Sequence, residues 1–537
     1  MCSSFFGRLG VGIHAYSCSP ATYTMHEISN LPLSIDHALQ LLKDKTPLRL
    51  GAEATGLIKA SHQFLQTLLA DQETAIYGVN TGFGAFCDVR IEGHDLSDLQ
   101  YNLLRSHSCG VGNPIATDLV RLMLLLKVHS LALGHSGVQL ETVQRLIDLY
   151  NHDVLPVVYD KGSLGASGDL VPLAHLSLPL IGEGEVWWQG KRLPAADVYL
   201  ALGWQPIVLG AKEGLALING TQFTLALAVW AYGQGRQIVE LAHMTAALSA
   251  EAYQAKHQPY HALIQLVRPH KGQILSAERM RYWLEDAPMA EVDKKAVQDP
   301  YSFRCIPQVH GASLAALDHI GAALETEINS VTDNPLLFVE TEEVLMGGNF
   351  HGQPIALPAD YLTLALSELG SISERRTYLL LGGKRGLPEF LTANPGLESG
   401  LMIPQYAAAS LASLNKQLCT PASADSIVSS NGQEDHVSMG ANAALKALMV
   451  ADNVEQILAI EWLTAAQALY LRGDDQGGYP IAPRLADRLA NYRHWLGTPI
   501  ADDRIMAAEI SRTRSWLVDQ SFNESSTDPR QDHQEIV

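Results

Sequence analysis

The chain has 537 residues, of which 47% are hydrophobic and 18% are charged, a composition typical of a globular protein with a large interior. Its formal net charge of −20 at pH 7 disfavours nucleic acid and anionic membranes as partners. Its six cysteines lie far apart and form no CxxC pair, so we expect reduced thiols in a cytoplasmic protein rather than a disulfide or zinc framework.

The first half of the chain predicts helices separated by loops. Residues 1–24 contain an apolar stretch that His14 interrupts, which makes a poor signal peptide, and we expect a disordered extension there. Apolar residues recur at helical spacing over residues 34–69, with a break near residues 47–56, and another helix is predicted over residues 96–112. Residues 116–134 are apolar nearly all round but include charged side chains, which indicates a buried core helix rather than a membrane span. The polar residues of this helix are Arg121, Lys127 and His129.

The second half predicts longer helices. A strand-like passage at residues 182–194 is expected to form a hairpin that turns at Gln189-Gly190. One helical pattern extends over residues 438–471, and it would be roughly 50 Å long at 1.5 Å per residue, as in helices that pack in bundles. The other long patterns cover residues 214–255, 311–331, 359–381 and 403–418.

The predicted fold class is therefore mainly α, a long-helix bundle with a smaller N-terminal α+β domain. We expect the smaller domain over residues 25–230 and the bundle over residues 231–523. The polar residues 524–537 are expected to form a disordered tail.

The most informative stretch is KGSLGASGDLVPLAH at residues 161–175, with the small triplet Ala166-Ser167-Gly168 at its centre. Small residues let the backbone fold back on itself, because glycine accepts dihedral angles and close approaches that a Cβ forbids. If the amide nitrogen of Gly168 reaches the carbonyl carbon of Ala166, a ring can close. Loss of water and of the Ser167 hydroxyl then leaves an exocyclic methylene, which is an electrophile. The alternative is a glycine-rich turn that caps a helix through Asp169.

Two polar residues in other loops are candidates for the same site. Tyr77 precedes a Gly/Asn/Thr loop in YGVNTGFG, where its phenolate could remove a carbon-bound proton; a tyrosine packed against the loop is the alternative. Asn219 interrupts an apolar helical run in LINGTQ, where a side-chain amide needs a partner. It could donate to a carboxylate or to a carbonyl of the 166–168 loop, or it could cap a helix.

The segment VQDPYSFRCIPQ supplies three further candidates, Gln298, Tyr301 and Arg304. Tyr301 and Arg304 are spaced i, i+3, which places them on one face of a helical turn. The planar guanidinium of Arg304 suits a substrate carboxylate, and Tyr301 can act beside it as an acid or hydrogen-bond donor. A surface arginine is the alternative, which the neighbouring Pro, Phe, Cys and Ile residues disfavour.

Two further loops complete the set, with Phe350 in GGNFHG and Glu434 in NGQEDHVSMG. Glu434, Asp435 and His436 are consecutive, so their side chains point in different directions, and neither HxxxH nor HxxE spacing is present. We therefore expect no metal site here. Capping of the following helix by residues 433–435 is the structural alternative for Glu434.

These segments, in this order, resemble the histidine and aromatic amino acid ammonia-lyases over about residues 28–500. The resemblance implies that Ala166, Ser167 and Gly168 form a methylidene-imidazolone group, with no external cofactor, which takes up the amine of an amino acid substrate. It also implies that Tyr77 removes a β-proton, after which ammonia departs and an α,β-unsaturated acid is released.

The resemblance assigns roles to the other candidates as well. It implies that Arg304 grips the substrate carboxylate and that Phe350 belongs to the aromatic lining. Tyr301, Asn219 and Gln298 match polar groups around the electrophile. Because the enzymes of this family are homotetramers whose active sites combine loops from three subunits, a homotetramer is expected here.

Substrate choice depends, by the same resemblance, on Ser106-His107 and on Glu434. A carboxylate can accept the N–H of an imidazole, whereas a phenyl ring would leave it buried without a partner. We therefore expect deamination of L-histidine to urocanate and ammonia. Some tyrosine ammonia-lyases share the segment around His107, so Glu434 carries the choice. The alternatives are a tyrosine or phenylalanine ammonia-lyase, a 2,3-aminomutase with the same electrophile, and a non-catalytic scaffold that never cyclises the loop.

Overall fold

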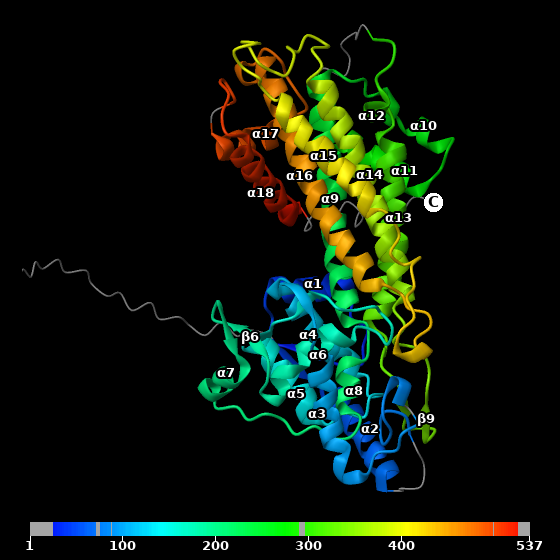
Figure 1. The fold of residues 1–537 in the computed structure, drawn as a ribbon. Coiled ribbons are helices and arrows are strands. Elements are labelled where there is room, and N and C mark those ends of the chain that lie inside the picture. Colours follow the sequence, from blue (N-terminus) through cyan, green and yellow to red (C-terminus); the bar gives the residue numbers. More distant parts are fainter. Residues whose placement is uncertain (1–24, 71–75, 87, 289–295, 498, 525–537) are drawn as a thin grey trace, which may run out of the picture.

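The structure is a computed structural model that describes residues 25–70, 76–86, 88–288, 296–497 and 499–524 (Figure 1). The predictions for residues 1–24 and 525–537 lie outside the described residues. Glu524, where the polar tail was expected to begin, is the last residue of helix α18.

The N-terminal part combines short helices with short strands, at the lower end of the molecule in Figure 1. Its helices are α1 (Ile35–Lys43), α2 (Ala52–Ala70), α3 (Leu96–His107), α4 (Thr117–Ala132), α5 (Leu140–Asn151), α6 (Leu170–Ser177), α7 (Ala195–Leu202) and α8 (Glu213–Ile218). Its strands are β1 (His26–Ile28), β2 (Leu48–Leu50), β3 (Val111–Pro114), β4 (Leu155–Pro156), β5 (Tyr159–Lys161), β6 (Glu185–Trp188) and β7 (Lys191–Pro194).

The strands pair in small separate sheets. Strands β1 and β2 are parallel, β3 pairs antiparallel with β5, and β4, β6 and β7 form one antiparallel sheet. The predicted hairpin is confirmed as β6 and β7, with Val186 opposite Leu193. Gln189 (φ 51°) and Gly190 (φ 74°) both have the positive φ that a two-residue hairpin turn of this hand requires.

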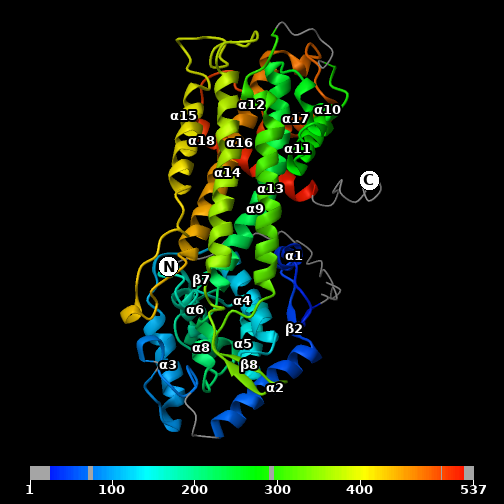
Figure 2. The ribbon, with the colours of Figure 1, turned by 90° about the vertical axis from the view of Figure 1, so that its right-hand side faces the viewer.

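The C-terminal part is a bundle of long helices. Figure 2 shows α9, α13, α14 and α16 side by side, extending from the N-terminal part towards the far end of the molecule. The helices of this part are α9 (Gln222–Tyr253), α10 (Ala262–Leu266), α11 (Lys271–Trp283), α12 (Tyr301–Arg304), α13 (Ile306–Ile328), α14 (Gln353–Leu380), α15 (Met402–Leu418), α16 (Gly440–Leu471), α17 (Pro483–Leu496) and α18 (Met506–Glu524). The hairpin of β8 (Leu336–Phe338) and β9 (Glu343–Leu345) connects α13 to α14 and packs back on α2. The mainly helical prediction is confirmed.

One predicted helix is wrong in a way that matters for the site. The expected helix over residues 214–255 is interrupted, because α8 ends at Ile218 and α9 begins at Gln222. The backbone of Gly220, with φ +133°, pairs there with Gly168 instead of continuing the helix. Helix α9 then continues across residue 230, where the two domains were expected to divide, so an unbroken helix connects the two parts.

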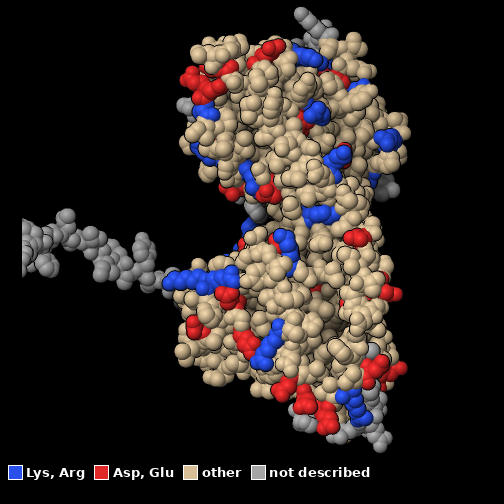
Figure 3. Space-filling model, viewed as in Figure 1, with Lys and Arg blue, Asp and Glu red and all other residues tan. Residues whose placement is uncertain are grey.

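Helix α4 is a buried core helix, as predicted. Residues 119–132 are all buried, including Arg121, Lys127 and His129. None of the helices in the described part of the chain is long and apolar enough to cross a membrane. On the face drawn in Figure 3, basic and acidic side chains are scattered among each other.

A buried ion pair ties the bundle helices together. Arg376 of α14 and Glu461 of α16 are both fully buried and pair through two hydrogen bonds, of 2.5 and 2.9 Å. Ser249 of α9 donates to the same carboxylate at 2.6 Å, and Arg376 also donates to the carbonyl oxygen of Ser302 in α12 at 3.3 Å. Four helices are thereby fixed around one charge pair, and one of them carries Tyr301 and Arg304.

Candidate active site

The 166–168 triplet lies in a tight turn directly ahead of helix α6. Gly168 has φ +75°, and a Cβ built on it would lie 2.2 Å from the carbonyl oxygen of Gly220. The amide of Asp169 donates to the same oxygen at 2.7 Å. A larger residue at position 168 would push the two backbones apart, so the turn needs glycine both for its dihedral angle and for this close approach.

The carboxylate of Asp169 ties the turn to helix α9. It accepts hydrogen bonds from the Ser163 hydroxyl (3.0 Å) and from the hydroxyl and the amide of Thr224 (both 2.8 Å). Burial raises the pKa of Asp169, and the hydrogen bonds from Thr224 and Ser163 oppose that rise. The side chain makes no capping bond to α6, so the alternative of a turn capped through Asp169 is wrong.

Asn219 lies in the break between α8 and α9 and reaches the triplet. Its side-chain amide donates to the carbonyl oxygen of Ser167 at 2.7 Å, which is one of the two partners expected for it. The backbone carbonyl oxygen of Asn219 accepts a hydrogen bond of 3.0 Å from Nζ of the buried Lys127. Burial lowers the pKa of Lys127 to about 7, with the charge of Asp333 acting in the opposite direction.

Glu434 completes this group from a loop far away in the sequence. Its Oε1 accepts a hydrogen bond of 2.9 Å from the Ser167 hydroxyl. Its Oε2 accepts two more, from Ser429 (2.7 Å) and Ser430 (3.0 Å), which lie in the tight turn just before it. One carboxylate oxygen is thus held by the turn, while the other faces Ser167.

The same loop is fastened to the triplet by its backbone. The carbonyl oxygen of Gly165 accepts a hydrogen bond from the Ser438 hydroxyl at 3.2 Å, and the amide of Met439 donates to Leu164 at 3.0 Å. Segments that are more than 260 residues apart therefore fix each other's position. Because these bonds involve the backbone, the loop as a whole is held against the triplet.

His107 is the last residue of α3 and lies within electrostatic range of Glu434. Its Nδ1 lies 2.9 Å from the carbonyl oxygen of Leu103 and 3.0 Å from the Ser106 hydroxyl. A carbonyl can only accept, so Nδ1 carries the proton and Nε2 is the acceptor of the neutral ring. Burial lowers the pKa of His107, and the Leu103 carbonyl and the charge of Glu434 oppose that effect.

Tyr77 lies in a loop that borders the turn before Glu434. Its hydroxyl accepts a hydrogen bond of 3.3 Å from the amide of Gly84, and its ring meets Phe83 edge-on at 6.5 Å. A Cβ built on Gly84 would lie 3.9 Å from the hydroxyl of Ser430. The half-buried Tyr77 is therefore placed near the site, although it also packs against its own loop.

Phe350 is half-buried in a loop that is connected to the residues after Glu434. The next residue, His351, lies 3.3 Å through Nε2 from the carbonyl oxygen of His436, and the two rings stack at 5.6 Å. A Cβ built on Gly352 would lie 2.9 Å from the Ser438 hydroxyl, the group that holds Gly165. The Phe350 loop thus belongs to the same group of loops.

The segment with Gln298, Tyr301 and Arg304 is not brought to this place within one chain. Helix α12 lies at the far end of the bundle, whereas α6 and α8 lie in the N-terminal part (Figure 1). The guanidinium of Arg304 stacks over the ring of Tyr301 at 4.3 Å, as their spacing predicts, and its Nε donates to the carbonyl of Asp299 at 3.0 Å. Tyr301 is 69% exposed and Gln298 is exposed, so both are accessible from outside the chain.

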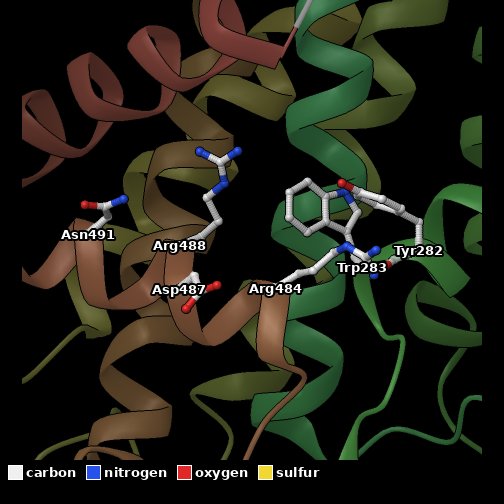
Figure 4. Close-up of a pocket in the computed structure, with 6 residues that line it drawn as sticks. All are labelled: Tyr282, Trp283, Arg484, Asp487, Arg488 and Asn491. Carbon is white, nitrogen blue, oxygen red and sulfur yellow. Dashed lines mark hydrogen bonds between the residues drawn. The ribbon is translucent and has the colours of Figure 1, made fainter. Parts of the chain in front are cut away.

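A cavity of about 260 Å³ lies elsewhere, between the end of α11 and helix α17 (Figure 4). It contains none of the predicted site residues. The side chains that line it are Tyr282, Trp283, Arg484, Asp487, Arg488 and Asn491. We therefore place the candidate active site at the Ser167 loops, because the convergent polar contacts are there.

Sequence reasoning missed several residues of the site. Ser429 and Ser430 precede the recognised QEDHVSM segment and carry no signal of their own. The sequence indicates only a helix-capping role for Asp169. The sequence shows Lys127 only as a charged residue in a core helix. A lysine inside an apolar run is nevertheless a signal of its own, because such a group needs a buried partner.

Comparisons with known proteins agree with this architecture. Histidine ammonia-lyase of Geobacillus thermodenitrificans is 46% identical over 495 residues, which cover 92% of this chain and 97% of that protein. The enzyme of the same name from Deinococcus radiodurans is 48% identical over 490 residues, or 90% of this chain and 92% of that protein.

Solved structures share the fold over nearly the whole chain. A crystal structure of histidine ammonia-lyase from Trypanosoma cruzi has a TM-score of 0.85 at 40% identity and covers 93% of this chain and 94% of its own. Tyrosine aminomutase from Streptomyces globisporus has a TM-score of 0.88 at 34% identity, covering 94% and 98%.

The helical bundle and the glycine-rich loop that Asn219 and Glu434 contact together place the protein among the lyases with a helical-bundle fold. The sequence model of the family described as "aromatic amino acid lyase" matches residues 33–493. The chain belongs to the aromatic amino acid lyase family.

Proposed function

We propose that this protein is an ammonia-lyase that converts L-histidine to urocanate and ammonia without an oxidant. The observation that carries the proposal is the carboxylate of Glu434, whose Oε1 lies 2.9 Å from the hydroxyl of Ser167. A carboxylate in this position can accept the N–H of an imidazole, and a phenyl ring offers it no partner. The relatives named histidine ammonia-lyase, 42–48% identical over most of the chain, support the same substrate.

We propose further that Ala166, Ser167 and Gly168 form a methylidene-imidazolone group. The nitrogen of Gly168 bonds to the carbonyl carbon of Ala166, which becomes doubly bonded to the nitrogen of Ser167, and the carbonyl oxygen leaves as water with the amide hydrogens of Gly168 and Ser167. The Ser167 hydroxyl leaves with the α-hydrogen as a second water. The residues fit this group, because Gly168 is confined to a turn that only glycine accepts and the Asn219 amide holds the Ser167 carbonyl at 2.7 Å. When formed, the group supplies an electrophilic methylene carbon for the substrate amine.

The other residues then bind the substrate and move a proton. In this proposal Tyr77, in a loop beside the Glu434 turn, accepts the β-proton, and Glu434 orients the imidazole. His107 has its Nδ1–H engaged with Leu103, which leaves Nε2 as a second acceptor for the ring or for a bridging water. Arg304 would hold the carboxylate, with Phe350 in the aromatic lining.

We propose that the active enzyme is a homotetramer whose sites combine several chains. Helix α12, which consists of Tyr301–Arg304, lies at the opposite end of the bundle from helix α6, which follows the Ser167 loop (Figures 1 and 2). A substrate at Ser167 therefore needs another copy to supply Tyr301 and Arg304. Coexpression of S167A with R304A tests this arrangement. Mixed assemblies should regain turnover, because some of their sites receive both wild-type residues, whereas each variant alone should be inactive. A mixture as inactive as its components would refute shared sites.

A cytoplasmic location is part of the proposal. It rests on the sequence and on three cysteines, Cys109, Cys305 and Cys419, which carry free thiols in the described part of the chain. Labelling of thiols in freshly lysed cells measures this directly. Free thiols support a reducing compartment, and quantitative disulfide formation would contradict it.

The test of the activity uses purified protein with L-histidine, L-tyrosine and L-phenylalanine in separate cuvettes. Urocanate, coumarate and cinnamate absorb at different near-ultraviolet wavelengths, so one scan reports both activity and substrate. Urocanate from L-histidine as the dominant product is the expected result. The mass of the peptide that contains Ser167 should be short by two waters, and an unmodified peptide would contradict the proposed electrophile.

The second candidate is an aminomutase, which returns the ammonia to the β-carbon. It is favoured by one observation, the structural similarity to tyrosine aminomutase at a TM-score of 0.88. Chromatography of the reaction with L-tyrosine distinguishes the two, because the aminomutase yields a β-amino acid. Accumulation of that product, without urocanate from L-histidine, would replace the first proposal.

A further inference from the structure

A layer of buried charges lies beneath the Ser167 loop. It consists of Lys127, Lys212, Asp169 and Asp333, each at most 4% exposed. Charged side chains are costly to bury, so each is expected to have a specific partner. The proposed chemistry uses none of these four groups, which raises the question of what they do there.

Three members of the layer have partners within it or on nearby loops. Lys212 donates to Asp333 at 3.0 Å and to the carbonyl of Ser136 at 2.9 Å. Asp169 accepts its three hydrogen bonds from Ser163 and Thr224. Both carboxylates are thus held by groups other than Lys127, so Lys127 is not required as the direct partner of either.

Lys127 instead acts on the segment that touches Ser167. It rises from the core helix α4, and its Nζ donates to the carbonyl oxygen of Asn219 at 3.0 Å. This carbonyl is at the C-terminal end of α8, where no further helical turn supplies a donor. The next carbonyl, of Gly220, is held by the amide of Asp169 at 2.7 Å. Two successive carbonyls therefore fix the segment that presents the Asn219 side chain.

We propose that Lys127 is a positioning residue that holds the Asn219 peptide so that the Asn219 amide is aimed at the carbonyl of Ser167. The inference rests on the proposed function. Removal of the α-hydrogen of Ser167, in the step that expels its hydroxyl as water, moves electron density onto the Ser167 carbonyl oxygen. A fixed N–H donor at 2.7 Å stabilises that charge as it develops. Nζ can donate to Asn219 whether or not it is protonated.

The chain offers a matched control on the same helix. Arg121 is 3% exposed, and its guanidinium binds the carbonyl of Tyr150 at 2.9 Å and the carboxylate of Asp153, with no bond to the Ser167 loops. R121M and K127M each remove one buried cation from α4. Loss of stability is common to both variants, whereas loss of the Asn219 contact belongs to K127M alone.

The experiment compares wild type, K127M, K127R and R121M for melting temperature, for the mass of the Ser167 peptide and for turnover of L-histidine. We expect K127M to show a peptide population that has lost fewer than two waters and a kcat at least tenfold lower, with KM changed less. K127R should restore both values towards wild type, because arginine again supplies a donor. R121M should melt earlier yet be fully modified and within about twofold of the wild-type kcat.

Full modification and normal kcat in K127M would overturn the inference, and so would equal defects in K127M and R121M. If K127M does not fold, K127Q provides the same test, because its amide ends one atom earlier and falls short of Asn219. An unmodified wild-type peptide would instead refute the proposed electrophile, so the two failures are distinguishable.

Discussion

Replacement of Glu434 by glutamine tests substrate choice most directly. The carboxylate accepts from Ser429 and Ser430 on one oxygen and from Ser167 on the other. Glutamine keeps the size but has one acceptor oxygen and one NH2 donor. If its oxygen stays with the two serine hydroxyls, its NH2 occupies the place of Oε1, where an imidazole N–H would then meet a donor.

The size of the effect follows from the bond that is lost. A hydrogen bond to a charged group contributes about 1.5–3 kcal/mol, so kcat/KM for L-histidine should fall about 10- to 150-fold in E434Q. The phenyl side chain of L-phenylalanine has no N–H to offer the carboxylate, and the turnover of this substrate should be unchanged or higher, because a neutral amide is less costly to bury beside a phenyl ring. The ratio of kcat/KM for L-histidine to kcat/KM for L-phenylalanine should therefore fall, because the histidine reaction becomes slower.

The assay measures kcat/KM for both amino acids in wild type, E434Q and D435N. Asp435 is exposed and adjacent in sequence, so D435N controls for the loss of a negative charge in this loop. An undiminished histidine reaction in E434Q would refute the assignment of Glu434 as the selector. Equal losses on both substrates would show that Glu434 serves a step common to them rather than substrate choice.

Three further substitutions have expected outcomes that follow from single contacts. S167A should fold but keep an unmodified loop peptide and lose nearly all turnover, and retained activity would show that the loop is not used. G168A should leave the loop uncyclised, as read by peptide mass, because the new Cβ would lie 2.2 Å from a backbone oxygen at a positive φ; normal modification would contradict this. R376M leaves Glu461 buried without its partner and should cost about 3–5 kcal/mol in urea unfolding, whereas a cost below 1 kcal/mol would refute its structural role. Burial lowers the pKa of Lys127 to about 7, so between that pH and about 10.5 the unfolded chain binds more protons than the folded chain. The free energy of unfolding of the wild type should therefore rise with pH in this window. The rise should exceed that of K127M by up to about 1.4 kcal/mol per pH unit. Parallel profiles would contradict it.

Periodicity predicted the parts of the fold that depend on local pattern. The helix at 403–418 was placed within one residue, since α15 is Met402–Leu418, and the hairpin turn at Gln189-Gly190 was correct. The break at Asn219 could not be predicted in this way, because apolar residues at helical spacing lie directly before and after it. A tertiary contact, the pairing of Gly220 with Gly168, decides the backbone there.

The candidate site shows the same division. Residue chemistry and the order of the motifs pointed to Ser167, Asn219 and Glu434, which the structure brings into direct contact. Nothing in the spacing indicated that Arg304 lies at the other end of the bundle, because that distance is set by the length and direction of the intervening helices. The serine partners of Glu434 in its own turn carry no signal in the sequence either, since serine is common in loops.

In both parts of the molecule a buried basic side chain holds the backbone of a candidate site segment. Lys127 donates to the carbonyl of Asn219 beside Ser167, and Arg376 donates to the carbonyl of Ser302 beside Tyr301. A backbone carbonyl held from the core side leaves the side chains of its segment free to face outwards. In the proposed homotetramer, the long helices fix the separation of the two ends, so copies that associate as rigid bodies would bring preformed halves of a site together. Such halves need little reorganisation on assembly, which lowers the entropic cost of building a catalytic site from separate chains.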